Sequence, residues 1–233
     1  MQALDFLIHE DAQILVFNKP AGLAVQGGSG VQQSLEDMLA AFAKSNGKRP
    51  RLVHRLDRET SGVIVAARTK PAAAFLSEAF AGRDAKKTYL AIACAGAPEP
   101  RDGEINLALR KTNQRGLDIM VIDAAGQSAL TRYRTLSATP AVALLELHPE
   151  TGRMHQLRAH LAAIGRSIAG DGKYGGLFNI GGVAVPGLML HAAVLDIPHP
   201  SGGRAHFEAP PPAAFLETCR SLELEAPLAW VTC

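Results

Sequence analysis

A carboxylate flanked by cations is the first candidate for chemistry in this chain. In the segment Val53–Gly62, with the sequence Val-His-Arg-Leu-Asp-Arg-Glu-Thr-Ser-Gly, Asp57 lies between Arg55 and Arg58. Nearby cations favour the ionised form of a carboxylate, which suits a nucleophile or an electrostatic stabiliser better than a general acid. A surface ion pair, or a polar turn at the mouth of a strand, would show the same pattern. The segment alone leaves these interpretations open.

A second charged residue lies at the edge of an expected helix core. The segment Arg153–Ile164 predicts a helix that ends at Gly165. At about 100° per residue, Arg158 borders the apolar stripe of this helix rather than its solvent face. An unpaired buried charge is very unfavourable, so Arg158 needs an anionic partner. Asp57 is a candidate for that partner.

Tyr89 is a third residue of interest because the chain has only three tyrosines. It lies in the segment Lys87–Cys94, which predicts a strand. A strand tyrosine usually belongs to the core or its rim, but its ring can also stack on a nucleic-acid base.

The residue spacing argues against a metal site, a phosphate-binding loop and a hydrolase nucleophile. His155 and His160 are five residues apart, which places them about 140° apart on a helix, so they cannot ligate a metal from one face. The segment Gln26–Gly30 is glycine-rich, but it lacks the Lys-Ser/Thr that follows a phosphate-binding loop. Ser61 lacks the Gly-x-Ser-x-Gly elbow of a hydrolase. The sequence therefore predicts no metal site.

The elements that must position these residues read as many strands with a few interspersed helices, which predicts an α+β fold around a mostly antiparallel sheet. The expected strands are Ile14–Phe17, Val63–Ala67, Lys87–Cys94, Gly103–Leu109, Leu117–Ile122, Leu130–Leu136, Val142–His148 and Leu188–Ile197. The expected helices are Ser34–Ser45, Lys70–Arg83 with Phe75 and Ala79 on its inner stripe, Arg153–Ile164 and Ala213–Leu222.

Composition indicates a soluble globular protein. The chain has 233 residues, 47% of them hydrophobic, but its apolar runs are too short to cross a bilayer and no signal peptide is recognisable. Its three cysteines have no pairing pattern, which favours the reducing cytoplasm. The net charge of +2 is unevenly spread: the segment Lys44–Arg115 holds 15 basic and 7 acidic residues, and Asp196–Cys233 holds 2 and 5. Such asymmetry permits binding of a polyanion on one face.

An ordered set of motifs resembles the RluA-type pseudouridine synthases. The first is Asn18-Lys19-Pro20-Ala21-Gly22, and the strongest is His54-Arg55-Leu56-Asp57-Arg58-Glu59-Thr60-Ser61-Gly62. The others are Lys87-Thr88-Tyr89, Thr151-Gly152-Arg153-Met154-His155-Gln156-Leu157-Arg158-Ala159-His160, Gly170-Asp171-Gly172-Lys173-Tyr174-Gly175, Leu190-His191-Ala192 and His199-Pro200. These motifs occur in the same order as in the family and span nearly the whole chain. If each motif had only a local structural role, that order would not be expected.

The resemblance implies a pseudouridine synthase fold, in which a curved, mostly antiparallel mixed sheet is flanked by helices around a central catalytic cleft. It implies conversion of uridine in RNA to pseudouridine, without cofactor or metal. Asp57 matches the catalytic aspartate, Tyr89 the tyrosine that packs on the target base, and Arg158 the arginine that pairs with the catalytic carboxylate. Arg55 matches a residue that fills the space left by the flipped base. Whether Asp57 attacks carbon 1′ of the sugar or removes a sugar proton stays open.

The resemblance also sets expectations for partners and organisation. A base must leave the stack before it can be rotated, and basic residues can hold the neighbouring phosphates meanwhile. The expected RNA-binding and base-flipping residues are Arg55, His54, Lys48, Arg49, Arg51 and Arg83. Residues 1–233 are expected to form a single catalytic domain, with no separate N-terminal RNA-binding domain, acting as a cytoplasmic monomer. The loop motifs favour large-subunit ribosomal RNA as substrate; transfer RNA, or a non-catalytic RNA-binding module, are the alternatives.

Overall fold

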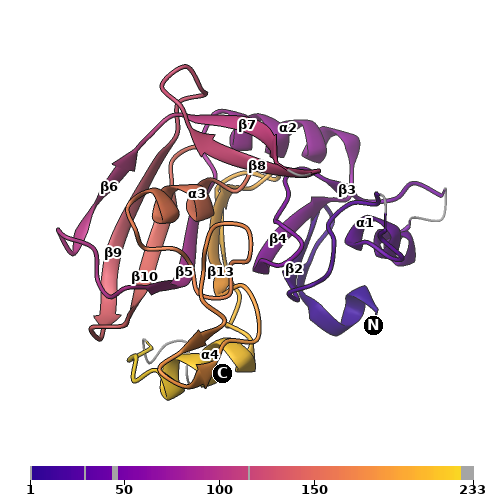
Figure 1. The fold of residues 1–233 in the computed structure, drawn as a ribbon. Helices are drawn as coiled ribbons and strands as arrows, with labels where there is room; N and C mark the ends of the chain where they lie inside the picture. The colour runs from indigo at the N-terminus through magenta and orange to yellow at the C-terminus, as the bar shows by residue number, and fades with distance from the viewer. Residues whose placement is uncertain (1, 29, 44–46, 115, 227–233) are drawn as a thin grey trace. The chain divides into compact units, whose positions relative to one another are not determined.

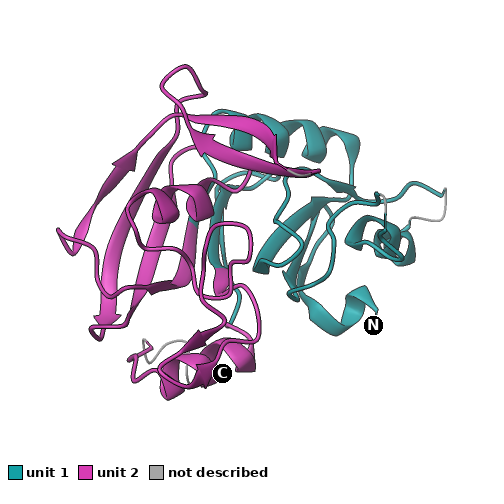
Figure 2. Cartoon of the chain, viewed as in Figure 1, with its two compact units in different colours: residues 1–87, 192–210 teal, residues 88–191, 211–233 magenta. Residues whose placement is uncertain are grey.

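The computed structural model describes residues 2–28, 30–43, 47–114 and 116–226, which fall into two compact units (Figures 1 and 2). Unit 1 comprises residues 1–87 and 192–210, and unit 2 comprises residues 88–191 and 211–233. Cys233 and the end of the helix expected up to Ser45 lie outside the described residues. Within the described part of the chain, no helix combines the length and apolarity that crossing a membrane requires.

Unit 1 is built on strands in the order β1-β2-β4-β13, with β3 paired to β4 and β14 paired to β13. The pairs β1–β2, β2–β4, β3–β4 and β13–β14 are antiparallel. The bounds are β1 (Leu7–Glu10), β2 (Ile14–Lys19), β3 (Arg51–Leu52), β4 (Ser61–Ala67), β13 (Leu190–Pro198) and β14 (Arg204–Glu208). Every residue of β4 is buried, which explains why its sequence is continuously apolar rather than alternating.

The helices of unit 1 begin at polar caps. The hydroxyl of Ser34 accepts a hydrogen bond from the backbone N–H of Asp37 and so begins α1 (Leu35–Met38). Thr69 does the same for α2 (Lys70–Ala81), which packs against β3 and β4. Two 3₁₀ helices, η1 (Ala3–Phe6) and η2 (Leu39–Phe42), complete the unit.

Unit 2 contains an antiparallel sheet in the order β5-β10-β9-β6 and two separate two-stranded sheets, β7–β8 and β11–β12. The bounds are β5 (Lys86–Cys94), β6 (Asp102–Asn106), β7 (Leu109–Gln114), β8 (Leu117–Ile122), β9 (Leu130–Ala138), β10 (Val142–Pro149), β11 (Asn179–Ile180) and β12 (Val183–Ala184). Helix α3 (Gln156–Ala163) packs against β8, β9 and β10 (Figure 1), and α4 (Ala213–Ser221) lies near the C-terminus.

The structure confirms a large, mostly antiparallel sheet architecture with interspersed helices, and it corrects three local expectations. Phe75 does not belong to the inner stripe of α2: it is 42% exposed, whereas Leu76 is fully buried. The expected strand Gly103–Leu109 is divided, because β6 ends at Asn106 and Leu109 begins β7. The first helix is shorter than expected, because η2 replaces the α-helix after Met38.

Candidate active site

The Asp57 loop lies at the entrance to β4 in unit 1. Asp57 is half-buried, and its backbone carbonyl accepts a hydrogen bond of 3.1 Å from the N–H of Thr60, which closes the turn. Two residues later Gly62 adopts φ +115°, and an added Cβ there would lie 2.1 Å from the carbonyl oxygen of Ala192. Only glycine allows this close backbone approach, so the Thr-Ser-Gly end of the motif is explained by packing.

The guanidinium of Arg58 is directed at the turn that follows β2. Its Nε donates a hydrogen bond of 3.0 Å to the carbonyl of Gly22, and the N–H of Gly22 donates one of 2.8 Å to the carbonyl of Arg58. The backbone next to Asp57 is therefore held on the segment that carries the Asn-Lys-Pro-Ala-Gly motif. Arg55 is exposed.

His54 is half-buried in unit 1 and is neutral. Its Nε2 accepts a hydrogen bond of 3.0 Å from the N–H of Val65, and its ring stacks on Phe80 with 4.3 Å between centroids. Burial, with a smaller contribution from the charge of Lys87, lowers the pKa of His54 to about 3. An imidazole with this pKa carries no charge at neutral pH, so His54 offers a phosphate no ion pair.

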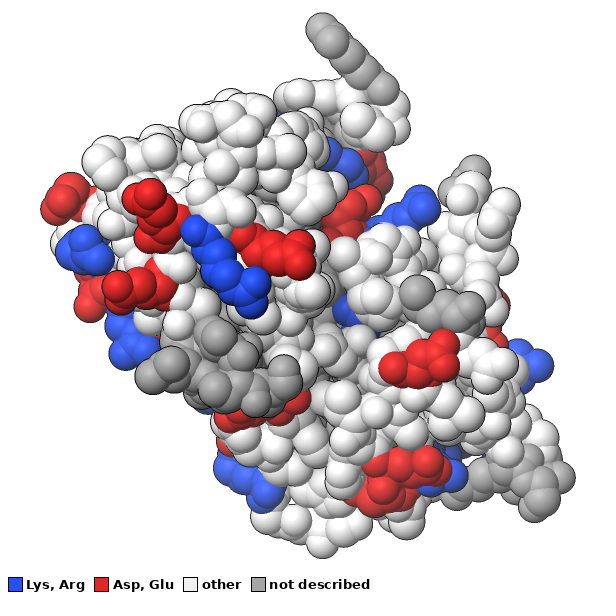
Figure 3. Space-filling view, turned by 90° about the horizontal axis from the view of Figure 1, so that it is seen from below, with Lys and Arg blue, Asp and Glu red and all other residues white. Residues whose placement is uncertain are grey.

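The other expected RNA-binding residues are exposed in unit 1. They are Lys48, Arg49, Arg51 on β3, Arg55 and Arg83. Arg83 has φ +64° just after α2, and its carbonyl accepts a hydrogen bond of 3.2 Å from Nζ of Lys86. Figure 3 shows one face of the molecule, on which basic and acidic side chains are interspersed. RNA binding by these residues stays a prediction.

Tyr89 lies on β5 in unit 2, opposite Leu147 of β10 in the antiparallel register. It is half-buried. The preceding residue, Thr88, pairs its hydroxyl with Nδ1 of His148 at 3.3 Å, which fixes the neighbouring side chain on the sheet. The strand position expected from the sequence is confirmed, and the stacking of this ring on a base stays a prediction.

Arg158 has an anionic partner, as its position on the helix required. In unit 2, its Nε and Nη2 donate to the two oxygens of Asp171, at 2.8 and 2.7 Å. The side chains are 3% and 0% exposed, so this is a buried bidentate pair. Oδ1 of Asp171 also accepts from the backbone N–H groups of Lys173 and Tyr174, at 3.0 and 3.2 Å. The pairing of Arg158 with Asp57 joins residues of different units and stays a prediction.

Tyr174 completes the surroundings of Arg158. The carbon at the centre of the guanidinium lies 5.2 Å from the ring centroid of Tyr174, within cation–π range. The Tyr174 hydroxyl accepts a hydrogen bond of 2.8 Å from the N–H of Met120 on β8 and contacts Nδ1 of His155 at 3.0 Å. His155 is the residue before α3 and has φ +47°. A single tyrosine thus ties the start of α3, its arginine and the β7–β8 sheet together.

Asp171 and Tyr174 were not singled out from the sequence as site residues, although both lie in the quoted Gly-Asp-Gly-Lys-Tyr-Gly motif. The available signal was the need of Arg158 for an anion, combined with a carboxylate between two glycines 13 residues later. Glycines permit the tight turn that brings such a carboxylate back onto a helix. Sequence spacing alone does not distinguish it from Asp57.

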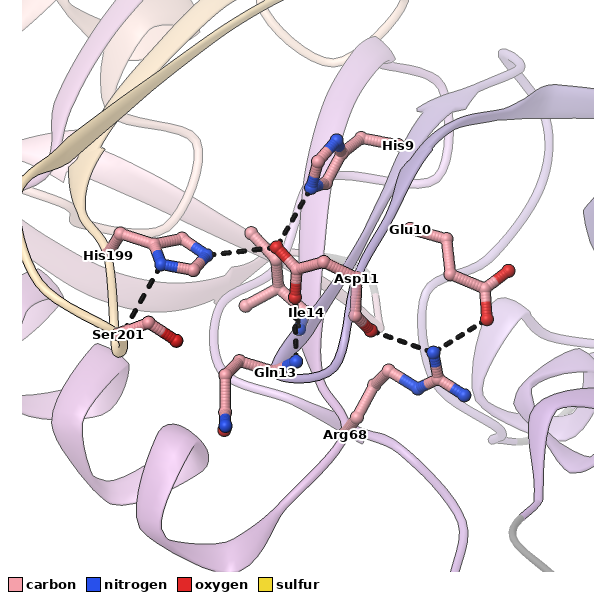
Figure 4. A network of polar contacts seen from close by, with 8 residues as sticks. All are labelled: His9, Glu10, Asp11, Gln13, Ile14, Arg68, His199 and Ser201. Atoms are coloured by element: carbon pink, nitrogen blue, oxygen red, sulfur yellow. Dashed lines mark hydrogen bonds and ion pairs between the residues drawn. The ribbon is translucent and has the colours of Figure 1, made fainter.

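Two histidines and an aspartate form a cluster outside the candidate site. Nε2 of His9 and Nε2 of His199 each lie 3.0 Å from Oδ2 of Asp11, as Figure 4 shows. Burial acts to raise the pKa of Asp11, but hydrogen bonds from these histidines and from the backbone of Gln13 and Ile14 hold it well below its usual range. The cluster joins the β1–β2 turn to the β13–β14 turn.

The tautomer of His199 favours a structural role for this cluster. Its Nδ1 accepts a hydrogen bond of 3.2 Å from the N–H of Ser201, so in the neutral ring Nε2 carries the proton. That nitrogen donates to Asp11 and presents no lone pair to a metal. Among the residues that the structure describes, no group of three or more histidine, cysteine or acidic side chains has the arrangement of a metal site.

Comparison with known proteins decides the family. The family model described as RNA pseudouridylate synthase matches residues 13–163, well over half of the chain. The chain belongs to the RNA pseudouridylate synthase family. The match includes Asp57, Tyr89 and Arg158. The architecture agrees with membership: the structure titled Human RNA Pseudouridylate Synthase Domain Containing 4 superposes with a TM-score of 0.83 at 31% identity, covering 97% of this chain and 95% of that one.

Curated relatives extend the family assignment. The mitochondrial pseudouridylate synthase RPUSD4 of Xenopus tropicalis is 32% identical, covering 95% of this chain and 81% of the relative. Ribosomal large subunit pseudouridine synthase C of Rickettsia bellii is 42% identical over 73% of this chain, but this chain spans only 57% of that relative's length. An uncharacterised RNA pseudouridine synthase of Zymomonas mobilis is 39% identical, covering 89% of this chain and 94% of the relative. The names of these relatives indicate that this chain is an RNA pseudouridine synthase, which is an isomerase.

Proposed function

We propose that this chain converts specific uridines of large-subunit ribosomal RNA into pseudouridine. The observation that supports this target is the 42% identity to a Rickettsia relative named as a ribosomal large subunit pseudouridine synthase. The chain spans about half the length of that relative, so the target is an inference from the shared region.

The reaction is an isomerisation in which all atoms are conserved. The bond from N1 of uracil to carbon 1′ of the sugar breaks, the base turns, and C5 forms the new bond to carbon 1′. C5 then loses its proton and N1 gains one. We assign the step at the sugar to Asp57, packing on the turned base to Tyr89, and pairing with the Asp57 carboxylate to Arg158. A closed turn for Asp57 and a rigidly held guanidinium for Arg158 support these roles, because reacting groups must be held in place before the reaction.

Binding of the RNA backbone is assigned to the exposed cations of unit 1. Lys48, Arg49, Arg51 and Arg83 reach solvent and can neutralise phosphates, which makes binding weaker as salt concentration rises. Arg55 is exposed and is assigned to the space that the flipped base leaves. His54 takes part only as a neutral ring, because burial lowers its pKa to about 3.

We also propose that the protein acts in the cytoplasm as a monomer. The described cysteines, Cys94 and Cys219, are buried free thiols, and burial raises the pKa of Cys219 to about 12. Thiols of this kind are inert and are compatible with a reducing compartment. Light scattering of the purified protein, and fractionation of the source cells, test the two proposals.

The activity is tested with Asp57→Asn. The substrate is large-subunit ribosomal RNA labelled with tritium at C5 of uridine, and the label is released when C5 loses its hydrogen after bonding to the sugar. Asp57→Asn should abolish tritium release while RNA binding survives. The matched control is Glu217→Gln, which removes an exposed carboxylate on α4. Release at the wild-type rate by Asp57→Asn would show that another residue acts at the sugar.

The target is tested by mapping pseudouridines in ribosomal and transfer RNA from cells that lack this protein. Loss of one or more sites in large-subunit ribosomal RNA, restored by the wild-type chain but not by Asp57→Asn, is the expected result. Loss confined to transfer RNA would overturn the ribosomal target and keep the isomerase. RNA binding without tritium release from either RNA would indicate a non-catalytic RNA-binding module.

A further inference from the structure

We propose that Phe178 determines which RNA this chain accepts: an unpaired base beside the target uridine stacks on its ring, while Lys173 binds a neighbouring phosphate. This inference rests on the proposed function, because it adds a contact between the same enzyme and its RNA. Phe178 directly precedes β11 in unit 2, and Lys173 lies in the turn after Asp171. Both lie beyond residues 13–163, to which the family model is matched, so family membership does not account for them.

Phe178 and its neighbour Leu177 form an exposed apolar pair. Their side chains are 53% and 52% exposed, and in the described part of the chain no other two large exposed apolar side chains are adjacent in sequence. Burial of large apolar side chains is favourable, so a pair that folding leaves at the surface points to a surface that is covered on binding.

The backbone holds this exposed pair in a fixed position. The carbonyl of Leu177 accepts a hydrogen bond of 2.8 Å from the N–H of Gly170, and the carbonyl of Phe178 accepts one of 2.9 Å from the N–H of Val185. The antiparallel pair β11–β12 follows directly. The ring is therefore ordered before RNA binds, which reduces the entropy that binding costs.

Phe178 rests on the turn that holds the anionic partner of Arg158. A Cβ added at Gly172 would lie 3.5 Å from Cζ and 3.7 Å from Cε2 of Phe178, so one edge of the ring lies close to the backbone next to Asp171. Asp171 is the buried partner of Arg158. A base stacked on Phe178 is thus bound beside the framework of Arg158. Since the target base is assigned to Tyr89, the base on Phe178 is a neighbouring one.

The charge around the pair favours a polyanion. Residues 172–195 include no aspartate or glutamate, and Lys173 is the one lysine or arginine among them. Hydrogen bonds from Lys111 and Asn113 lower the pKa of Asp118 on β8, and the charges of Lys111 and Lys173 add to this effect. Because Lys111 already pairs with Asp118, the exposed ammonium of Lys173 leaves a net positive charge, which attracts phosphate.

An aromatic ring beside a cation suits unpaired RNA. Every base has a π-face, so a ring such as that of Phe178 can stack on any unpaired base, whereas a base inside a duplex has no free face. Phe75 on α2 offers a contrast. It is the other exposed phenylalanine of the described residues, at 42%, but it lies one helical turn before the exposed carboxylate of Glu78, which repels phosphate.

The experiment measures RNA binding and tritium release for the full chain and its variants. Phe178→Ala removes the ring, Phe178→Leu keeps apolar bulk without a π-face, Phe178→Tyr keeps the ring, and Phe75→Ala is the matched control. The binding probes are a short single-stranded oligouridine and the same strand paired with oligoadenosine. The activity probe is large-subunit ribosomal RNA labelled with tritium at C5 of uridine.

A loss of affinity confined to unpaired RNA is the expected result. Phe178→Ala should weaken binding of the single strand by roughly 5- to 150-fold, the scale of one base–aromatic stack, and should leave binding of the duplex nearly unchanged. Phe178→Leu should lose most of the same affinity, whereas Phe178→Tyr and Phe75→Ala should match wild type. In the tritium assay Phe178→Ala should raise KM with little change in kcat, because the stack is present before and during the reaction.

The phosphate contact is tested separately with Lys173→Gln. Loss of one phosphate contact should reduce the slope of log affinity against log salt concentration by about 0.7 for the single strand. Phe178→Ala should keep the wild-type slope, because stacking releases no counterions.

Three outcomes would overturn the inference. They are wild-type affinity and KM in Phe178→Ala, wild-type affinity in Phe178→Leu, and a wild-type dimer in light scattering that Phe178→Ala dissociates, which would make the pair an interface between copies. Urea midpoints show whether each variant is folded, and Phe178→Leu carries the test if Phe178→Ala is not. Absence of tritium release from the wild-type chain would instead overturn the proposed function, while binding of oligouridine still tests Phe178, so the two failures are distinguishable.

Discussion

Asp171→Asn should destabilise unit 2 strongly because it breaks a buried ion pair at one end. The change keeps the volume of the side chain, and its remaining oxygen can still accept from the N–H groups of Lys173 and Tyr174. However, it places an amide donor against a guanidinium donor of Arg158 and removes the negative charge. The variant therefore isolates the ion pair from the backbone contacts of the same carboxylate.

The magnitude follows from the burial of the pair. Breaking a buried pair at one partner costs about 3–5 kcal/mol, and the Arg158 and Asp171 side chains are 3% and 0% exposed. With a urea dependence of about 3 kcal/mol per molar, the midpoint should fall by roughly 1–2 M. Circular dichroism in urea measures this shift, and amide hydrogen exchange should show faster opening of α3.

The matched control is Asp118→Asn on β8. Asp118 pairs with Lys111, but these side chains are 50% and 59% exposed, so solvent screens the pair and the urea midpoint should stay close to that of wild type. If Asp171→Asn and Asp118→Asn had equal midpoints, the burial argument would be refuted. Asp171→Ala should unfold at lower urea still, because it also leaves two backbone donors unpaired.

Three further substitutions test packing, capping and ionisation. Gly62→Ala should lower the free energy of unfolding, measured in urea, by about 3 kcal/mol or more, because the new Cβ would lie 2.1 Å from the carbonyl oxygen of Ala192. Gly27→Ala, whose new Cβ meets nothing within 4 Å, should match wild type, and similar losses in the two variants would contradict the argument. Ser34→Ala should lower the free energy of unfolding by about 1 kcal/mol and Tm by roughly 2–4 °C, because the helix cap is lost; an unchanged Tm would count against the cap. The pKa of His54 is lowered to about 3, so its contribution to stability is complete above about pH 6.5 and is lost as pH falls towards 3. His54→Gln should therefore make the free energy of unfolding less dependent on pH in this range. Parallel curves for the variant and wild type would disprove the assignment.

Much of the fold could be predicted from local pattern. The buried run of β4 and the Ser34 cap of α1 were readable because strand burial and helix capping depend on residues within a few positions of one another. Phe75 was predicted on the wrong face of α2 because that prediction used local pattern alone. A helical wheel gives angular spacing only, and the face of α2 that packs on β3 and β4 is decided by the sheet beneath it.

The candidate site was partly predictable. Its motifs lie in family order, and membership in the family is confirmed over residues 13–163. The position of Arg158 at the edge of a helix core correctly required an anion, but Asp171 was not identified as that anion. Choosing between two carboxylates needs the path of the turn at residues 170–176, and no periodicity describes that path.

The sequence by itself determined the family, the mostly antiparallel architecture and the need of Arg158 for a negative partner. Only the tertiary structure decided that Asp171 meets that need and that His54 is a neutral ring stacked on Phe80. The physical reason is the distance along the chain over which each kind of signal acts. Periodicity, caps and motifs act along a few residues, whereas the partner and the ionisation of a buried charge depend on which distant segments surround it.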